Sequence, residues 1–258
     1  MYIYSNEKLL LVDFSYYYIH RYFALMSWFN ISKTEFNEDL LLDKFENLMI
    51  GNIIKIAKKT KCKLKNTILV SDCKRSTIWR LDQCHKYKAN RELCQSKQPI
   101  NPKIYDVIDN IIIPSLKQLD VQYIGFDKLE ADDIISVIAK NTPNEKVIIT
   151  NDNDYLQLLN DNTTIINAKY KDLSSRSLGC PKKDLLMKIL IGDTSDNISS
   201  IVTKSTAKKL IEMSEEDLLD YLSKHNLFDK FNFNKKLIDM ESIPEEYKDL
   251  IKKDIQFI

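Results

Sequence analysis

Five short apolar segments, separated by longer stretches, constrain the fold of this chain more than any other feature of its sequence. They span residues 9–14, 67–71, 121–126, 146–150 and 163–167. The stretches at 37–59, 102–119 and 129–139 carry apolar residues at helical spacing. Strands that alternate with helices favour an α/β fold, in which helices flank a mostly parallel central sheet.

The pattern after residue 178 is helical. Pro181 opens one candidate helix, and further helices are expected at 184–190, 205–213, 215–224 and 244–252. We therefore predict an α/β core over residues 1–178 and a helical C-terminal region over 179–258. The last four residues, 255–258, are expected to fray.

The charge balance excludes one simple class of protein. The 258 residues include 38 Lys+Arg and 37 Asp+Glu, so the formal net charge is +1, which argues against a basic coat protein for nucleic acid. Five cysteines without a C-x-x-C pair, and a start without an apolar signal segment, favour a reduced, intracellular protein. No apolar stretch approaches the roughly 18 residues of a membrane span, so no membrane partner is expected.

Acidic residues lie at or shortly after the ends of the apolar segments. They are Asp13, Asp72, Glu130, Asp132, Asp133, Asp152 and Asp154, while Asp193 and Asp196 follow the helix expected at 184–190. The carboxyl ends of parallel strands share one edge of a sheet, where open α/β folds bind ligands. Crowded carboxylates repel one another unless a cation neutralises them, and Mg²⁺ or Mn²⁺ prefers such ligands. Two such ions can hydrolyse a phosphodiester. For any single acid, a helix N-cap is the alternative.

The segment 74–103, which follows Asp72, is strongly basic. It contains eight Lys or Arg residues against two acids, with Trp79 and Tyr87 between them. Basic side chains neutralise phosphates and aromatic faces stack on exposed bases, so this composition suits a strand of nucleic acid. A solvated, charged helix has the same composition, but the position next to the acids favours the first interpretation.

The motifs around these residues resemble, in the same order, those of the structure-specific 5′ nucleases. This family includes flap endonucleases, the 5′ nuclease domain of bacterial DNA polymerase I, and phage 5′-3′ exonucleases. The matching motifs are Leu11–Ser15, Asp72 with Trp79-Arg80 and Tyr87–Arg91, Glu130–Asp133, Thr150–Asp154 and Gly192–Ile198. Within the family, the pattern over residues 237–244 is most similar to the T-even phage ribonuclease H branch.

The resemblance implies a PIN-like catalytic core and a helix-hairpin-helix-like DNA-binding motif in the C-terminal region. It implies hydrolysis of phosphodiesters at flaps and at the 5′ ends of DNA and RNA:DNA duplexes, to remove RNA primers or flaps in DNA replication or repair. Two Mg²⁺ ions, replaceable by Mn²⁺, would be held by the nine acids above. We expect a monomer in the cytoplasm of a bacterium or of a virus-infected cell, with a single-strand-binding or other replication protein as a possible partner.

The resemblance also assigns individual roles. Asp13, Asp72, Glu130, Asp152 and Asp154 would be catalytic through the metals, and Lys88 or Arg91 would stabilise phosphate charge in the transition state. The basic arch, or gateway, of the family matches Arg80, Lys86, Tyr87, Lys88 and Arg91, which would contact nucleic acid, Tyr87 by stacking on a base.

One segment departs from the family pattern. Ser199–Ser205 contains no glycine, where most members have a glycine-rich hairpin that holds a duplex phosphate and often K⁺. Backbone that approaches a phosphate closely usually needs glycine, so a K⁺ site is in doubt. Lys204, Lys208 and Lys209 are the expected replacement contacts to duplex phosphates.

Two other functions stay open from the sequence. One is a flap- or duplex-binding protein of the same fold without catalysis, against which the complete set of acids argues. The other is a PIN-like ribonuclease, against which the motif Gly192–Ile198, typical of duplex DNA binders in the family, argues.

Overall fold

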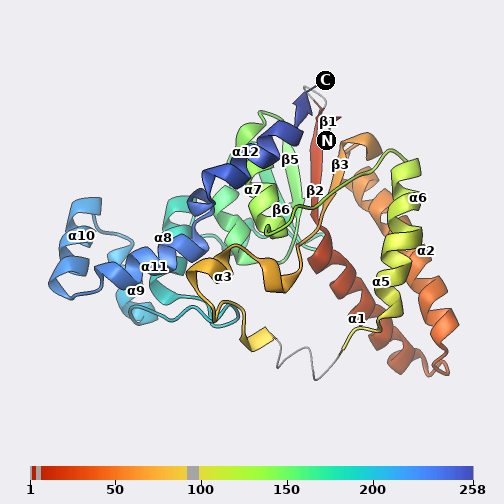
Figure 1. Ribbon diagram of the computed structural model, residues 1–258, viewed down its shortest axis with the longest axis horizontal. Helices are drawn as coiled ribbons and strands as arrows, with labels where there is room; N and C mark the ends of the chain where they lie inside the picture. The colour runs from red at the N-terminus through yellow and green to blue at the C-terminus, as the bar shows by residue number, and fades with distance from the viewer. Residues whose placement is uncertain (1, 4–6, 92–98, 258) are drawn as a thin grey trace.

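A five-stranded parallel sheet forms the centre of the molecule (Figure 1). The computed structural model describes residues 2–3, 7–91 and 99–257. The strands are β2 (Leu9–Asp13), β3 (Thr67–Val70), β4 (Gln122–Ile124), β5 (Lys146–Ile149) and β6 (Thr163–Ile166), in the order β4-β3-β2-β5-β6. The predicted α/β fold is confirmed, because all five apolar segments form strands of one sheet.

Helices cover both faces of this sheet (Figure 1). One face packs against α1 (Phe14–Ser32), α2 (Glu38–Thr60) and the continuous run of α5 (Lys103–Val107), the π-helical η3 (Ile108–Ile112) and α6 (Ile113–Gln118). The other face packs against α7 (Ala131–Asn141) and α12 (Glu245–Asp254). Alternate side chains of β2 pack on opposite faces of the sheet. Leu10 and Val12 enter the first core, while Leu9 and Leu11 enter the second.

Helix α1 is absent from the pattern of predicted helices. Its sequence carries apolar and aromatic residues on every side, so it shows no helical alternation. Tyr17, Leu25 and Phe29 enter the first core, while other apolar side chains of the helix stay partly open. Among the described residues, no helix is long and apolar enough to cross a membrane.

The C-terminal region adds a smaller helical layer. It contains α8 (Pro181–Ile191), α9 (Lys204–Leu210), α10 (Glu215–Lys224) and α11 (Phe228–Ile238), of which α11 was not predicted. Leu190, Leu210 and Leu222 form part of a separate small core. The chain then returns to the main core through Met240 and Ile251. The division of the chain at residue 178 stays a prediction.

The two ends of the chain lie together. Strand β1 (Tyr2–Ile3) pairs in parallel with β7 (Gln256–Phe257), and Ile3 is fully buried. The prediction of a frayed end is therefore wrong as far as Phe257. Backbone pairing with the other terminus, which local sequence does not reveal, holds this segment.

Candidate active site

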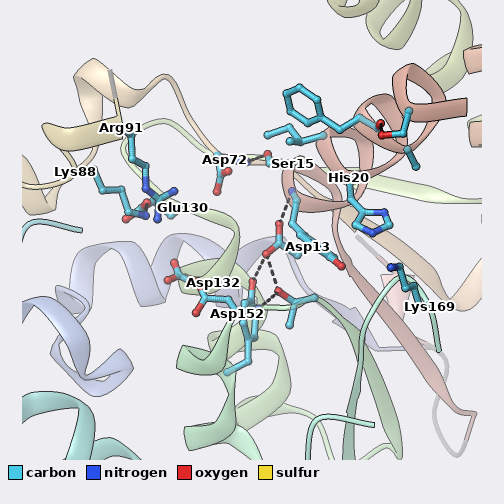
Figure 2. Close-up of a pocket in the computed structure, with 17 residues that line it drawn as sticks. Asp13, Ser15, His20, Asp72, Lys88, Arg91, Glu130, Asp132, Asp152 and Lys169 are labelled. Carbon is cyan, nitrogen blue, oxygen red and sulfur yellow. Dashed lines mark hydrogen bonds and ion pairs between the residues drawn. The ribbon is translucent and has the colours of Figure 1, made fainter. Parts of the chain in front are cut away.

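The carboxyl edge of the sheet brings the predicted acids into one cavity. Asp13 ends β2, Asp72 follows β3, Asp152 follows β5, and Glu130 immediately precedes α7. These four acids and Asp132 line a cavity of about 780 Å³ (Figure 2). Parallel strands produce this convergence, because all their carboxyl ends point to the same edge.

Asp13 is held from three directions. Its Oδ1 accepts a hydrogen bond from the Tyr16 amide at 3.1 Å, and its Oδ2 accepts from the hydroxyls of Thr150 and Tyr155, each at 3.2 Å. Burial and the nearby Asp72 raise the pKa of Asp13 to about 7. Asp13 is therefore both the N-cap of α1 and an acid whose charge needs a nearby cation.

Asp72 and Asp132 complete the acidic part of the cavity. Asp72 Oδ1 accepts from the Ala131 amide at 2.7 Å, and burial raises the pKa of both acids. The buried Oδ1 of Asp132 lies 3.9 Å from Arg80 Nη1, and it has no hydrogen-bond partner within the described residues. A buried carboxylate oxygen without a donor, beside other acids, is suited to bind a cation.

Arg80 lies beneath these acids and is only 2% exposed. Its Nη2 donates to Asp133 Oδ1 at 2.8 Å, and its Nη1 donates to Glu130 Oε2 at 2.9 Å and to Asp133 Oδ2 at 3.0 Å. Its Nε donates to the Leu237 carbonyl at 2.9 Å. This placement contradicts the predicted contact of Arg80 with nucleic acid, because its donors are used inside the protein.

Asp133 is also fully buried, and both its carboxylate oxygens accept hydrogen bonds. Besides Arg80, the Trp79 indole N–H and the Glu130 amide each donate to Oδ2 at 3.0 Å. The Glu130 contact is half of a capping box that starts α7. Asp133 thus fixes the start of the helix that carries Asp132, and its role as a metal ligand stays a prediction.

Glu130 is surrounded by donors. Lys88 pairs with its Oε1, while Arg80 and the Tyr87 hydroxyl, the latter at 3.1 Å, donate to its Oε2. Burial opposes the charge of Glu130, but Lys88 and Arg80 outweigh it and lower the pKa of Glu130. Tyr87 is 4% exposed, so the predicted stacking of its ring on a base is not compatible with the structure.

A second group of acids lies towards the C-terminal region. Asp154, Asp193 and Asp196 each offer an oxygen within 4.8 Å of the others, as Glu130, Asp132 and Asp133 also do. Lys188 on α8 pairs with Asp154 at 2.6 Å and with Asp193 at 2.5 Å. Asp196 pairs with Arg91 and with Lys88, the latter at 3.7 Å. These ion pairs place positive charge beside the outer group of acids.

The sequence reasoning missed Lys188. Its place on α8, one turn before the motif Gly192–Ile198, is the signal that identifies it. Gly192 turns the chain from α8 into this motif with φ of 67°, and a Cβ there would lie 2.5 Å from the Ile198 carbonyl oxygen. Glycine is therefore required at this turn, which aims Lys188 and Asp193 at each other.

The remaining predicted basic residues lie around the cavity. Lys88 and Arg91 line it, whereas the side chain of Lys86 is exposed. Lys204, Lys208 and Lys209 are exposed on α9, and the first two line a second cavity together with Lys188 and Asp193. Residues 92–98 of the predicted arch lie outside the described residues.

The fold and its acid-lined cavity define a class of nuclease. Residues 8–181 match the 5′-3′ exonuclease family through its N-terminal, resolvase-like domain, and the chain belongs to this family. The predicted family is thereby confirmed.

Several known proteins are similar to this chain. Ribonuclease H of Enterobacteria phage T4 is 30% identical over 175 residues, which are 65% of this chain and 57% of that protein. A 5′-3′ exonuclease of Bacillus subtilis is 33% identical over 164 residues, or 57% of this chain and 53% of that protein. The matched regions thus span a little over half of these relatives. The T5 5′-exonuclease with bound zinc has the same fold, with a TM-score of 0.62 at 15% identity, over 96% of this chain and 98% of that one.

Proposed function

We propose that this protein is a Mg²⁺-dependent 5′-3′ exonuclease and flap endonuclease that acts on DNA and RNA:DNA duplexes. Its task would be the removal of RNA primers or flaps in DNA replication or repair. The observation that carries this proposal is the gathering of Asp13, Asp72 and Asp132 in a cavity edged by Lys88 and Arg91, where the buried Oδ1 of Asp132 accepts no hydrogen bond from any described residue.

Two relatives support the choice of substrates. The T4 relative is named a ribonuclease H, which supports an RNA:DNA hybrid as one substrate. A bacteriophage T5 flap endonuclease variant, which has the same fold with a TM-score of 0.63 and 15% identity over 96% of this chain and 97% of that one, was solved with DNA and metal ions. That structure supports flapped DNA as the other substrate.

The donor set fits two hard divalent cations. Asp13, Asp72, Glu130, Asp132 and Asp152 would hold one, and Asp154, Asp193 and Asp196 would hold the other. All these side chains offer carboxylate oxygens, which Mg²⁺ and Mn²⁺ prefer. When bound, the ions supply a reactive water and stabilise the leaving oxygen of the phosphodiester.

Lys88 and Arg91 place positive charge beside the bond to be cut. The Lys88 amide donates to the Asp196 carbonyl at 2.9 Å, and its backbone is left-handed with φ of 56°, which fixes the direction of its side chain. Fixed cations aimed at a phosphate stabilise the charge that develops during cleavage. Arg80 contributes indirectly, because it holds Glu130 and Asp133 and so positions the start of α7.

Cleavage of end-labelled substrates tests this function. The substrates are a 5′-flapped DNA duplex, a blunt DNA duplex, an RNA:DNA hybrid and single-stranded RNA, each with Mg²⁺ or EDTA. We expect Mg²⁺-dependent products released from the 5′ side of the duplexes, whose lengths separate exonuclease from flap cleavage. Binding without cleavage in Mg²⁺ or Mn²⁺ would favour the binding protein, and cleavage of RNA alone would favour the ribonuclease.

A further inference from the structure

Helix α11 packs against α8, the helix that leads into two of the outer acids (Figure 1). Asn234, near the middle of α11, is only 3% exposed, although asparagine is usually a surface residue. Its Nδ2 donates to two backbone carbonyls, those of Ile189 and Ser199, each at 2.9 Å. One side-chain amide therefore joins three segments of the C-terminal region.

The two carbonyls lie on either side of the loop Gly192–Ile198, which carries two of the outer acids. Ile189 is in the last turn of α8, where a helix leaves carbonyls without donors of its own. The Asp193 amide, four residues further on, donates at 2.9 Å to the Ile198 carbonyl rather than into α8. Asn234 therefore caps this end of α8 and ties it to the far end of the loop.

The C-terminal end of α11 is bonded to residues around the inner acids. Arg80, which positions the start of α7, donates from its Nε to the Leu237 carbonyl at 2.9 Å. Gln157 Nε2 donates to the Asp154 carbonyl at 2.9 Å and to the Ile238 carbonyl at 3.2 Å. Helix α11 is thereby fixed to the start of α7 and to the backbone at Asp154.

The loop is also held by the basic segment that is expected to contact nucleic acid. The Lys88 amide donates to the Asp196 carbonyl at 2.9 Å. The side-chain amide of Asn197 donates to the Lys86 carbonyl at 2.9 Å. Asn234 is thus a support for the loop that does not pass through the basic segment, so its effect can be measured without substrate.

We infer that Asn234 is a positioning residue for the outer cation site. By holding the loop of Asp193 and Asp196 on α11, it keeps their carboxylates close to Asp154, so that the three acids offer oxygens within 4.8 Å of one another. Asn234 lies beyond residues 8–181, which match the family. The outer site thus depends on a part of the chain outside that match. This inference rests on the proposed function, because the two-cation site belongs to it.

Mn²⁺ binding to the full chain, without substrate, tests this inference. Asn234→Leu keeps a branched side chain but removes both donors. We expect it to weaken the outer of two Mn²⁺ binding steps about tenfold in calorimetry and to leave the other step unchanged, because residues that orient metal ligands contribute about that much to affinity. Asp154→Asn, which removes an outer ligand, identifies the outer step.

Leu222→Ala is the matched control for stability. Leu222 is fully buried in the same small core as Leu190 of α8, and its truncation leaves a cavity there. It should lower the melting temperature in EDTA at least as much as Asn234→Leu does, without weakening the outer Mn²⁺ step. If Asn234→Leu does not fold, Asn234→Ser, which has one donor instead of two, replaces it with the same expected shift.

The metal dependence of cleavage links this inference to the nuclease proposal. On a 5′-flapped duplex, Asn234→Leu should need about tenfold more Mn²⁺ than the wild type to reach half of its maximal rate. Its rate at saturating Mn²⁺ should approach that of the wild type, because the ligands themselves are intact. Leu222→Ala should keep the Mn²⁺ requirement of the wild type.

The outcomes separate the two proposals. A wild type that binds Mn²⁺ in two steps but cleaves no duplex overturns the nuclease proposal, while the calorimetry still decides the role of Asn234. A wild type without a Mn²⁺ step that depends on Asp154 overturns the outer site and this inference with it. A wild type that cleaves, while Asn234→Leu and Leu222→Ala bind Mn²⁺ with equal affinities, overturns only the role of Asn234.

Discussion

Arg80 and Asp133 form a buried, bidentate ion pair beneath the cavity, with Nη2 2.8 Å from Oδ1 and Nη1 3.0 Å from Oδ2. The preceding residue, Asp132, lies at the cavity and leaves its buried Oδ1 without a hydrogen bond to any described residue. Arg80 Nη1 is 3.9 Å from this Oδ1, so both carboxylates lie near the guanidinium but only Asp133 is hydrogen-bonded to it. Asp133 completes the fold, and the oxygen of Asp132 that accepts no hydrogen bond is left for a metal ion.

This difference predicts opposite effects of two substitutions on stability. Asp133→Asn should lower the unfolding free energy by about 3–5 kcal/mol, because it leaves the buried Arg80 without a full counter-charge. Asp132→Asn should leave the unfolding free energy unchanged or raise it, since burial already disfavours the charged form of Asp132. Urea unfolding in EDTA measures both values. Equal losses in the two variants would contradict the assignment.

The pH dependence of stability without metal follows from the raised pKa values. Burial raises the pKa of Asp13 and of Asp154 from about 3.8 to about 7. Between these values the folded state binds more protons than the unfolded state, so the contribution of both acids to stability falls as pH rises. Melting temperatures in EDTA should drop from pH 5 to pH 7.5. Asp13→Asn should flatten the drop, and a rise over this range would oppose the account.

Lys188 should compete with a cation for the outer acids, because its Nζ pairs with Asp154 and Asp193. Lys188→Met is expected to tighten the weaker of two Mn²⁺ binding steps several-fold in calorimetry. It should also lower stability without metal. Lys183→Met on the same helix is the control, since Lys183 pairs only with Glu212 among the described residues. Identical Mn²⁺ titrations for the two variants would exclude this competition.

The exposed lysines of α9 should bind the duplex away from the site of cleavage. Replacing Lys208 and Lys209 by Ala should weaken duplex binding and lower the magnitude of the salt slope by about one to two. Lys55 and Lys58, exposed on the distant α2, provide a control with the same loss of charge (Figure 1). An unchanged slope in the α9 variant would mean that these lysines do not touch phosphate.

The sequence was sufficient to predict the sheet and the place of the acids. Buried parallel strands are nearly continuous apolar runs, and the acids that follow them meet at one edge whatever the detailed packing. Asp13 and Asp72 lie in one cavity for this reason. The sequence of α1 shows no helical repeat of apolar residues. Its role as a wall of that cavity was therefore not predicted.

Long-range pairing could not be predicted from the sequence. Arg80 and Tyr87 lie in a basic, aromatic segment of the kind that binds nucleic acid, yet both are buried against Glu130, which is far away in the chain. Local composition reports which charges a segment carries, but not which of them a distant acid will neutralise. Lys188 was not predicted for the same reason, because local composition does not show its pairing with Asp154.

Cleavage of a 5′-flapped duplex by the wild type and by Asp132→Asn, side by side in Mg²⁺ and in EDTA, tests the central claim most directly. Asp132 carries the carboxylate oxygen that is left for a metal, and its substitution should not disturb folding. The account predicts 5′ products from the wild type in Mg²⁺ and none in EDTA, with cleavage by the variant in Mg²⁺ at least about a hundredfold slower and duplex binding retained. Wild-type rates in the folded variant, or products that form equally in EDTA, would contradict it.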